Sequence, residues 1–261
     1  MLKLAVFFTL FFLLSCAASR TKQTSMFASN PVVSHRGAFK KNSFPENSIA
    51  ALREAIRLQC TGSEFDVRMS VDDSLVINHD PRYQNRQIDK TTYQELIQAK
   101  LSNGETFPTL REFLTAGLQN NRQTRLVVEI KPSDIGKDRA RLIAERVVKL
   151  VDELNATPKV VYISFDYDIL KKILQLHPNA PTQYLNGDKT PEQLKEDHIQ
   201  GADYNISVFK KNPDWIARAQ KSGIILNAWT VNDPADMKWL LSQKFEFITT
   251  NEPEMLLSMT K

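Results

Sequence analysis

The chain has 261 residues, of which 42% are hydrophobic and 25% are charged, and this ordinary globular composition excludes a disordered, collagen-like or low-complexity protein. Its net charge is only +4 and no run of Lys and Arg exceeds two residues, which argues against nucleic-acid binding through a basic stripe. A single α/β barrel typically contains about 250 residues, so one domain with a sizeable core is the first expectation.

The N-terminal residues 1–16 form a segment of their own. Lys3 precedes an almost uninterrupted apolar run from Leu4 to Leu14. This run is shorter than the roughly 20 residues that cross a bilayer, and it fits the hydrophobic region of an export signal. Its end, Leu13-Leu14-Ser15-Cys16, resembles the lipobox of bacterial lipoproteins, in which the cysteine is lipidated and becomes the new N-terminus. An ordinary signal peptide with an incidental cysteine is the alternative.

Three segments are therefore expected along the chain. A lipoprotein signal peptide covers residues 1–16, a polar and flexible tether covers 17–30, and the barrel domain covers 31–261. Two or more acyl chains on Cys16 would hold the protein stably at a membrane. We expect an exported bacterial lipoprotein that is membrane-anchored and faces the periplasm. Inner and outer membrane both remain open, as does the oligomeric state.

From Val32 onward, short apolar runs alternate with helical segments. Strands are expected over residues 32–34, 62–67, 75–78, 126–130, 160–164, 182–185, 203–206, 224–229 and 245–249. Helices are expected over residues 47–59, 92–99, 109–119, 137–154, 167–176, 190–196, 213–221, 234–242 and 252–259. This alternation is typical of an α/β fold with a parallel sheet.

The strand over 75–78 needs a separate interpretation, because it is one more than eight βα units require. The gap from Arg68 to Ser74 is too short for a parallel crossover, which takes about a dozen residues, so this strand is expected to fold back as a hairpin. Eight βα units then remain, and the sequence predicts a single (β/α)₈ TIM barrel. The long polar stretch 81–108 is expected to be a small insertion after the second strand that covers one face of the barrel.

Three strands end in reactive side chains, and active sites of such barrels lie at the carboxyl ends of the strands. The first strand stops at His35-Arg36-Gly37. Glu64 and Asp66 lie two residues apart on the second strand and share one face, as do Glu129 and Lys131 on the strand over 126–130. Acids inside a barrel repel one another, and a divalent cation relieves this, with oxygen ligands favouring Mg²⁺ or Ca²⁺ over Zn²⁺. Solvated surface acids are the alternative.

Two further side chains are candidates for the site. His79 follows the strand over 75–78, and together with His35 it offers an acid/base pair, since histidine titrates near neutral pH. Trp229 ends the strand over 224–229 and is either a packing residue or an aromatic wall for a substrate. Phe165 has the same two interpretations.

The order of these motifs resembles the glycerophosphodiester phosphodiesterase family. The resemblance extends from Val32 to the C-terminus and rests on His35-Arg36-Gly37, Pro45-Glu46-Asn47-Ser48, Glu64-Phe65-Asp66-Val67, His79-Asp80-Pro81, Phe107-Pro108-Thr109-Leu110, Glu129-Ile130-Lys131, Trp229-Thr230-Val231-Asn232 and Phe247-Ile248-Thr249-Thr250-Asn251-Glu252-Pro253. Two departures are a longer loop over 38–44 and Asn251, where the family more usually has Asp.

The resemblance implies a metal-dependent hydrolase that cleaves glycerophosphodiesters to glycerol 3-phosphate and an alcohol. It implies that His35 and His79 are the general acid and base in an order left open, with attack by water or by the neighbouring glycerol hydroxyl. The remaining roles that it implies are one divalent cation, Ca²⁺ or Mg²⁺, bound by Glu64, Asp66 and Glu129, and substrate contacts from Arg36, Lys131 and Trp229. The head-group alcohol and the metal stay open.

Two other functions compete with this interpretation. One is a lysophospholipase D or related phospholipase on the same barrel, which a hydrophobic groove beside the site would favour. The other is a non-catalytic, lipid-anchored binding protein, and the presence of both histidines and all three acids counts against it.

Overall fold

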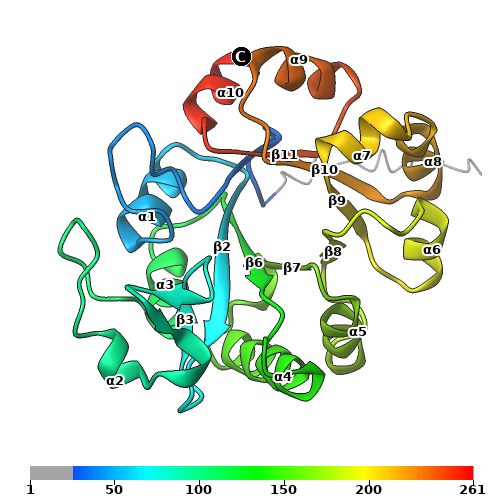
Figure 1. Cartoon of the computed structure of the whole chain (residues 1–261). Coiled ribbons are helices and arrows are strands. Elements are labelled where there is room, and N and C mark those ends of the chain that lie inside the picture. The colour runs from blue at the N-terminus through cyan, green and yellow to red at the C-terminus, as the bar shows by residue number, and fades with distance from the viewer. Residues whose placement is uncertain (1–25, 261) are drawn as a thin grey trace, which may run out of the picture.

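The computed structural model describes residues 26–260, and a closed barrel of parallel strands lies at the centre of this part of the chain (Figure 1). The barrel strands, in their order around the ring, are β1 (Val32–Ser34), β11 (Phe247–Thr250), β10 (Ile225–Trp229), β9 (Gly201–Asn205), β8 (Thr182–Tyr184), β7 (Val160–Ser164), β6 (Arg125–Ile130) and β2 (Gly62–Met69). Pairing of β1 with β2, in which Val33 lies opposite Gly62, closes the ring. The predicted (β/α)₈ barrel is confirmed. The predicted signal peptide and Cys16 lie outside the described residues.

Helices surround the barrel in Figure 1. They are α1 (Ile49–Arg57), α3 (Leu110–Leu118), α4 (Lys137–Glu153), α5 (Tyr167–Leu176), α6 (Pro191–Glu196), α7 (Ile206–Lys211), α8 (Asp214–Ser222), α9 (Pro234–Ser242) and α10 (Pro253–Met259), with a short 3₁₀ turn η2 (Thr157–Lys159) before β7. Between residues 26 and 260, no helix combines the length and apolar character that a membrane crossing requires.

The strands bury both of their faces, as parallel barrels do. In β7, Tyr162 packs in the large core between the sheet and the helices, whereas Val161 and Ile163 belong to a smaller cluster inside the barrel. Val127 from β6 and Leu185, directly after β8, join this inner cluster. Residues at alternate positions of one strand therefore point either to the helices or into the barrel, which decides which side chains can reach a site at its mouth.

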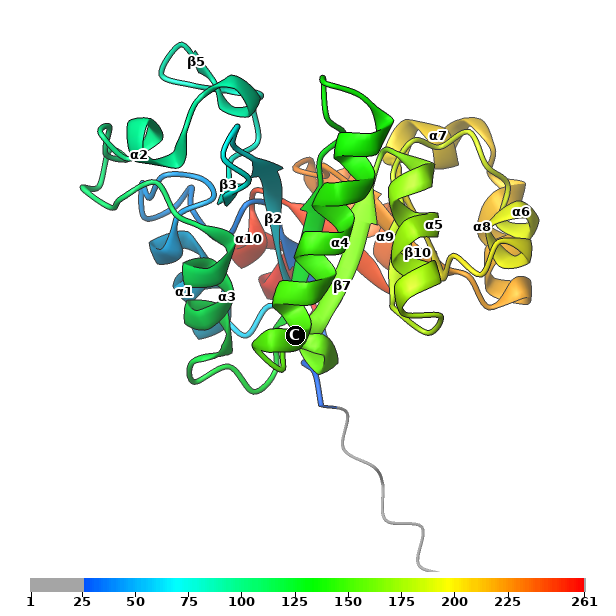
Figure 2. The ribbon, with the colours of Figure 1, turned by 90° about the horizontal axis from the view of Figure 1, so that it is seen from below.

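The predicted hairpin and insertion are also present. β3 (Leu75–Ile77) pairs antiparallel with β2 and is followed by β4 (Arg82–Tyr83), β5 (Arg86–Gln87), the 3₁₀ turn η1 (Ile88–Lys90) and α2 (Tyr93–Leu96). The insertion has a small core of its own, made of Val76, Ile88, Leu96 and Phe107. Figure 2 places β5 and α2 at the end of the molecule toward which β2 points. The insertion thus forms part of the rim at the carboxyl ends of the strands.

The segment after β9 differs from the prediction. The sequence predicts a strand over 203–206, but the chain turns into α7 after Asn205. The side chain of Asn205 accepts a hydrogen bond from the backbone of Ser207 and so caps the helix. The short apolar run that includes Ile206 and Phe209 hides this capping signal, because a run of that length fits a strand equally well.

The first described residues contact the amino-terminal end of the barrel. The backbone nitrogen of Ala28 donates to the carbonyl of Gln123 at 3.0 Å, just before β6. The side chain of Asn30 accepts a hydrogen bond from the backbone of Val32. The last residues of the tether predicted over 17–30 are therefore bonded to the barrel. They lie at the opposite end from the insertion (Figure 2).

Candidate active site

Three carboxylates lie side by side at the mouth of the barrel. Glu64 and Asp66 point inward from β2, and Glu129 points inward from β6, where it lies opposite Asp66 in the strand register. One oxygen from each lies within 4.8 Å of the others, and all three side chains are buried. The structure thus brings together the three acids that the sequence predicted as metal ligands.

The positive charge near this cluster does not fully offset its three carboxylates. Burial, together with the neighbouring acids Asp66 and Glu129, raises the pKa of Glu64 well above its usual value. Burial and Asp66 raise the pKa of Glu129 to about 7. Oε1 of Glu64 is buried without a hydrogen-bond partner among the described residues. Three converging oxygen ligands, one of them unpartnered, fit a hard divalent cation.

Lys131 partly offsets the negative charge. Its ammonium lies 2.8 Å from Oδ1 of Asp66 and 2.5 Å from Oε1 of Glu129. Although burial opposes ionisation of Asp66, Lys131 and a hydrogen bond from Asn47 hold the pKa of that carboxyl below its usual value. Lys131 is therefore an internal counter-ion of the carboxylate cluster in addition to its predicted role at the phosphate.

The loop between β1 and α1 holds two of the carboxylates in place. The backbone nitrogen of Arg36 donates to Oε2 of Glu64 at 2.8 Å, and the amide of Asn47 donates to Oδ2 of Asp66 at 2.7 Å. The loop turns sharply at Gly37, where φ is +81° and a Cβ atom would lie 2.7 Å from the backbone of Ala51. Only glycine fits this turn, which brings the loop over the ends of the strands.

The two predicted catalytic histidines border the same pocket as Glu64 and Glu129. His35 follows β1, and its Nε2 lies 4.0 Å from Oε2 of Glu64. Its Nδ1 lies 2.8 Å from Oδ1 of Asn251, which follows β11. An amide oxygen only accepts hydrogen bonds, so Asn251 fixes the proton of His35 on Nδ1 and leaves the lone pair of Nε2 toward the site. Burial and the charge of Arg36 lower the pKa of His35 to about 4, so this ring is neutral near pH 7.

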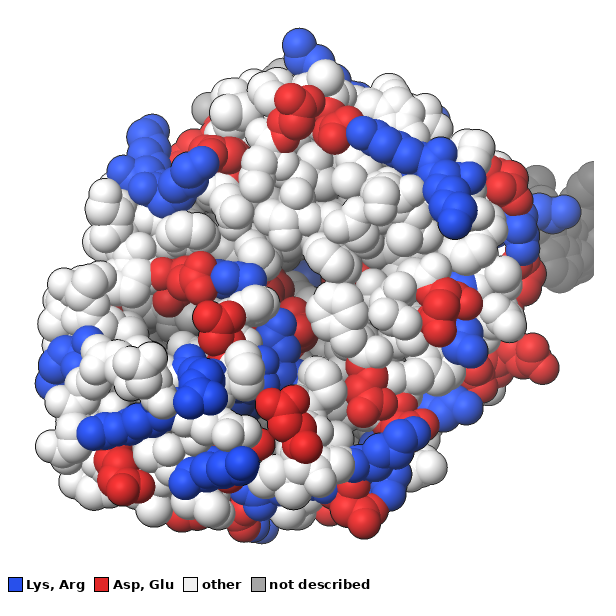
Figure 3. Space-filling model, viewed as in Figure 1, with Lys and Arg blue, Asp and Glu red and all other residues white. Residues whose placement is uncertain are grey.

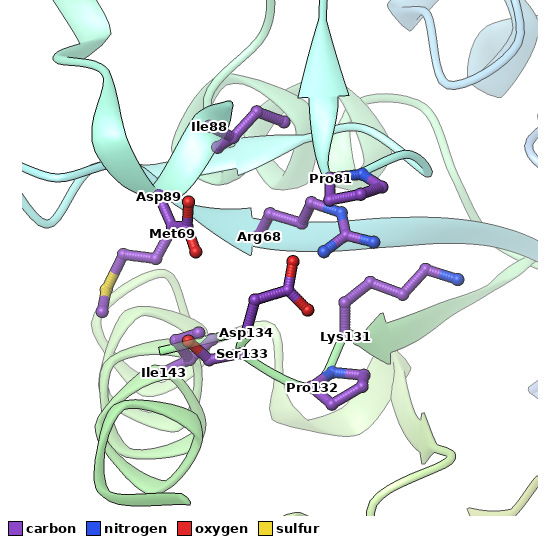
Figure 4. A pocket seen from close by; sticks show the side chains of 10 residues that line it. All are labelled: Arg68, Met69, Pro81, Ile88, Asp89, Lys131, Pro132, Ser133, Asp134 and Ile143. Atoms are coloured by element: carbon purple, nitrogen blue, oxygen red, sulfur yellow. The ribbon is translucent and has the colours of Figure 1, made fainter. Parts of the chain in front are cut away.

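His79 is more exposed than His35, and two neighbours hold it. Its Nδ1 lies 2.8 Å from Oδ1 of Asp80. Its carbonyl oxygen accepts two hydrogen bonds from Arg68, at 2.9 Å from Nε and 2.7 Å from Nη2. Figure 4 shows the guanidinium of Arg68 between Pro81 and Asp134, with Lys131 beside it. Arg68 therefore fixes the backbone from which the His79 side chain extends.

Arg36 and Trp229, both predicted to contact substrate, line the pocket as well. Nη1 of Arg36 donates to both oxygens of Glu46, at 2.9 and 3.0 Å. Its Nε lies 3.6 Å from Oδ2 of Asp66. The indole of Trp229 donates to the carbonyl of Asp203 at 2.8 Å and packs edge-on against Phe165, with 5.4 Å between ring centroids. Both aromatic rings are thus wall residues of the pocket.

The pocket has a volume of about 110 Å³ and two unlike sides. One side carries the acids and His35 from the ends of β1, β2 and β6 and His79 from the turn after β3, and the other carries Ile163, Phe165, Leu185 and Trp229. Figure 3 shows the same asymmetry around the hollow at the barrel mouth, with charged side chains gathered toward β2 and the insertion and uncharged surface toward β8 and β9. A ligand with a charged and an uncharged end fits this arrangement.

Sequence reasoning missed three residues of this site. Asp203, in β9, lies on the pocket wall and is almost completely buried. The strand pattern could have found it, because Ala202 and Tyr204 pack outward and leave Asp203 facing into the barrel. Arg68 lies two residues after Asp66 on β2, on the same face of the strand as Glu64 and Asp66, so the strand pattern could have found it too. The contact of Asn251 with His35 bridges two ends of the chain and has no local signal.

The comparisons with known proteins agree with this geometry. The glycerophosphoryl diester phosphodiesterase family model matches residues 35–255. A glycerophosphodiester phosphodiesterase of Caldanaerobacter subterraneus subsp. tengcongensis is 27% identical over 251 residues, which cover 88% of this chain and 97% of the relative. A crystal structure of a glycerophosphodiester phosphodiesterase from Parabacteroides distasonis superposes with a TM-score of 0.85 at 36% identity, covering 90% of this chain and all of that one. A phosphodiesterase of Oleispira antarctica, solved in complex with the product sn-glycerol-3-phosphate, has the same fold, with a TM-score of 0.74 at 23% identity over 88% of this chain and 96% of its own.

Proposed function

The chain belongs to the glycerophosphoryl diester phosphodiesterase family, and we propose that its pocket hydrolyses glycerophosphodiesters, the deacylated phospholipids, to glycerol 3-phosphate and an alcohol. The observation that carries this proposal is the cluster of three buried carboxylates at the barrel mouth, two of which, Glu64 and Glu129, line one pocket together with His35 and His79. The enzyme is a phosphoric diester hydrolase that depends on a divalent cation. Ca²⁺ or Mg²⁺ is the cation we propose, because every ligand is a carboxylate oxygen.

The mechanism follows from the charges around the pocket. A phosphodiester is an anion whose charge rises on attack. A cation bound by Glu64, Asp66 and Glu129 would supply Lewis-acid stabilisation of that charge. Arg36 and Lys131 add two more positive groups on the same side. Lys131 forms ion pairs with Asp66 and Glu129. If these acids bound a cation, the Lys131 ammonium would be available to contact the phosphate.

The two histidines differ in a way that assigns their roles. His35 is buried and neutral, and Asn251 holds its Nδ1 proton, so Nε2 is the base that takes a proton from the attacking oxygen, whether of water or of the adjacent glycerol hydroxyl. His79 is the more exposed of the two, on the side from which the leaving alcohol would depart, and Oδ1 of Asp80, 2.8 Å from its Nδ1, orients the ring. His79 is thus the acid that protonates the leaving oxygen. Replacement of either histidine by Ala is expected to lower kcat about 10²–10⁴-fold.

The first test uses protein that begins at Ala17 and glycerophosphoethanolamine as substrate. Release of glycerol 3-phosphate that EDTA abolishes and that Ca²⁺ or Mg²⁺ restores is the expected result. Glu64→Gln should abolish the metal-dependent rate, whereas Glu153→Gln, which removes an exposed acid paired with Arg111, should leave it unchanged. If metal binds and the fold is intact but no glycerol 3-phosphate appears, the substrate assignment is wrong. If no metal binds either, the catalytic interpretation fails and a binding protein is favoured.

A lysophospholipase D is the second candidate, and the pocket argues against it. Such an enzyme needs an apolar path for an acyl chain. Among the described residues the large exposed hydrophobic side chains are Met26, Val71, Ile135, Leu176 and Met255, and none of them lines the pocket. A rate on lysophosphatidylethanolamine that matched the rate on glycerophosphoethanolamine would reverse this preference.

We also propose that the protein is exported and anchored in a membrane through lipidated Cys16, facing the periplasm. The support is the sequence pattern of residues 1–16, together with the position of the first described residues at the amino-terminal end of the barrel, opposite the pocket (Figure 2). An anchor attached there directs the pocket away from its own bilayer, which suits water-soluble deacylated substrates. Incorporation of an alkyne-labelled fatty acid in cells by the full chain, and its loss in Cys16→Ala, would test the anchor. Labelling of both proteins, or of neither, would contradict it.

A further inference from the structure

The barrel interior holds one acid that the mechanism above does not use. Asp203 lies at the middle of β9, is 1% exposed, and borders the pocket on the side of its uncharged wall. It is not a member of the carboxylate cluster whose oxygens lie within 4.8 Å of one another. Its position therefore calls for a role separate from metal binding.

The surroundings of Asp203 fix its orientation but satisfy only part of its hydrogen-bonding capacity. Asn227, its register neighbour on β10, is a side-chain hydrogen-bond partner. The backbone carbonyl of Asp203 accepts the indole proton of Trp229. Its Oδ1, however, is buried without a partner in the described part of the chain. A buried polar atom without a partner costs folding free energy, so stability alone does not explain this carboxyl.

Asn227 itself is fixed from both sides, which makes the Asp203 site rigid. Its amide donates toward Oε1 of Gln183 at 3.4 Å, and its Oδ1 accepts from the hydroxyl of Thr249 at 3.2 Å. Asn227 on β10 is thus bonded to one residue on β8 and one on β11. Such a network holds Asp203 at the wall of the pocket rather than letting it rotate to find a partner elsewhere.

The location of Asp203 points to the group it meets. In the proposed function the phosphate lies on the side of the acids and histidines, and Phe165 and Trp229 form the opposite wall. The glycerol is common to all glycerophosphodiesters whereas the leaving alcohol varies, so we place the glycerol against the buried wall and the leaving alcohol toward solvent. A carbon chain against aromatic rings with a hydroxyl at a buried carboxyl satisfies both the wall and the unpartnered oxygen.

We propose that Asp203 is the residue that recognises a glycerol hydroxyl of the substrate, and this inference rests on the proposed function. Burial, with the charge of Glu129, raises the pKa of the Asp203 carboxyl well above its usual value. In either protonation state the unpartnered Oδ1 can accept a hydrogen bond from a substrate hydroxyl. Recognition by a buried polar group selects strongly against analogues without the hydroxyl, because the group is then left unpaired.

The test compares two ligands that share a phosphate and differ in the glycerol. Inhibition constants of glycerol 3-phosphate and of ethyl phosphate, which has no hydroxyl, are measured with the metal-loaded enzyme and bis(4-nitrophenyl) phosphate as reporter substrate. For Asp203→Leu, glycerol 3-phosphate should bind about tenfold more weakly while ethyl phosphate changes less than about twofold. Asp203→Asn keeps a donor and an acceptor and should retain the preference for glycerol 3-phosphate within about threefold, and it serves as the second variant if Asp203→Leu does not fold.

The control is Thr182→Val, which removes a buried, unpartnered hydroxyl from the neighbouring strand β8 without touching the pocket. It should change neither constant. Equal weakening of both ligands in Asp203→Leu, or no change in either, would overturn the inference, and so would loss of the preference in Asp203→Asn. If the wild-type enzyme hydrolyses the reporter but releases no glycerol 3-phosphate from glycerophosphoethanolamine and does not prefer glycerol 3-phosphate over ethyl phosphate, the proposed function itself has failed.

Discussion

Asn251 offers a direct way to test the electrostatic description of the site. Its Oδ1 lies 2.8 Å from Nδ1 of His35, at a position where the family more usually has Asp. Asn251→Asp would place a negative charge at the same distance from the ring with almost no change in shape. An opposite charge this close typically raises the pKa of a neighbouring cationic acid by about 1–3 units, or about 1.4–4 kcal/mol.

The expected effect on the rate follows from the sign of that shift. Burial and Arg36 lower the pKa of His35 to about 4, so the base is neutral across the ordinary pH range. In Asn251→Asp the imidazolium form gains stability, and the base is lost as the pH falls through a higher value. The acidic limb of the pH profile of kcat/KM, which reports the essential base of the free enzyme, should move upward by about 1–3 units. The plateau at high pH should change much less.

The assay is release of glycerol 3-phosphate at saturating metal between about pH 4 and pH 9. This range contains the acidic limb after an upward shift of about 1–3 units. Asn120→Asp serves as the control because it adds the same charge at an exposed turn after α3, near the opposite end of the barrel, and should leave the limb in place. An acidic limb that stays where it is in Asn251→Asp, or that moves downward, would refute the assignment of His35 as the base held by Asn251.

Three further predictions concern the metal, the second histidine and the loop. Saturating Ca²⁺ or Mg²⁺ should raise the melting temperature of the wild-type protein in a thermal scan, because a bound cation relieves the carboxylate repulsion. Glu64→Gln should remove most of that rise. An equal rise in both proteins would contradict the ligand assignment. Arg68→Met should lower kcat about tenfold with little change in glycerol 3-phosphate inhibition, since it frees the backbone of His79 without touching the phosphate side; a loss of inhibitor affinity instead would show a different role. Gly37→Ala should destabilise the protein by about 1–3 kcal/mol in urea unfolding, because its Cβ would lie 2.7 Å from Ala51 and φ is +81°, and unchanged stability would mean that the turn is not constrained.

The sequence predicts most of the fold because the barrel repeats a simple local pattern. Most strands contain a short apolar run and several are followed by polar residues, and the hairpin at 75–78 follows from the length of the gap before it. Boundaries depend on capping, which is why the segment after Asn205 is a helix where the pattern indicates a strand. Glu64, Asp66 and Glu129 could be predicted because they lie in strands whose alternating pattern shows which side chains face inward. His35 and His79 could be predicted because they closely follow a strand. The hydrogen bond between His35 and Asn251 joins residues 216 positions apart and depends on the closure of the barrel, which no local pattern encodes.

The division of the pocket follows from which strands supply its two sides. The ends of β1, β2 and β6 provide the base, the carboxylates and Lys131, and the hairpin strand β3 beside β2 leads to His79, so the groups that handle the phosphate come from one side of the ring. The β7 to β10 ends provide aromatic and aliphatic side chains, with Asp203 as the one acid that the described pocket lining carries there. Were all four acids on one side, an additional cation or a second Lys would be needed to offset their charge. Asp203 lies outside the three-carboxylate cluster and keeps a buried Oδ1 free for a substrate hydroxyl, so one barrel mouth combines a charged reaction centre with a separate recognition site.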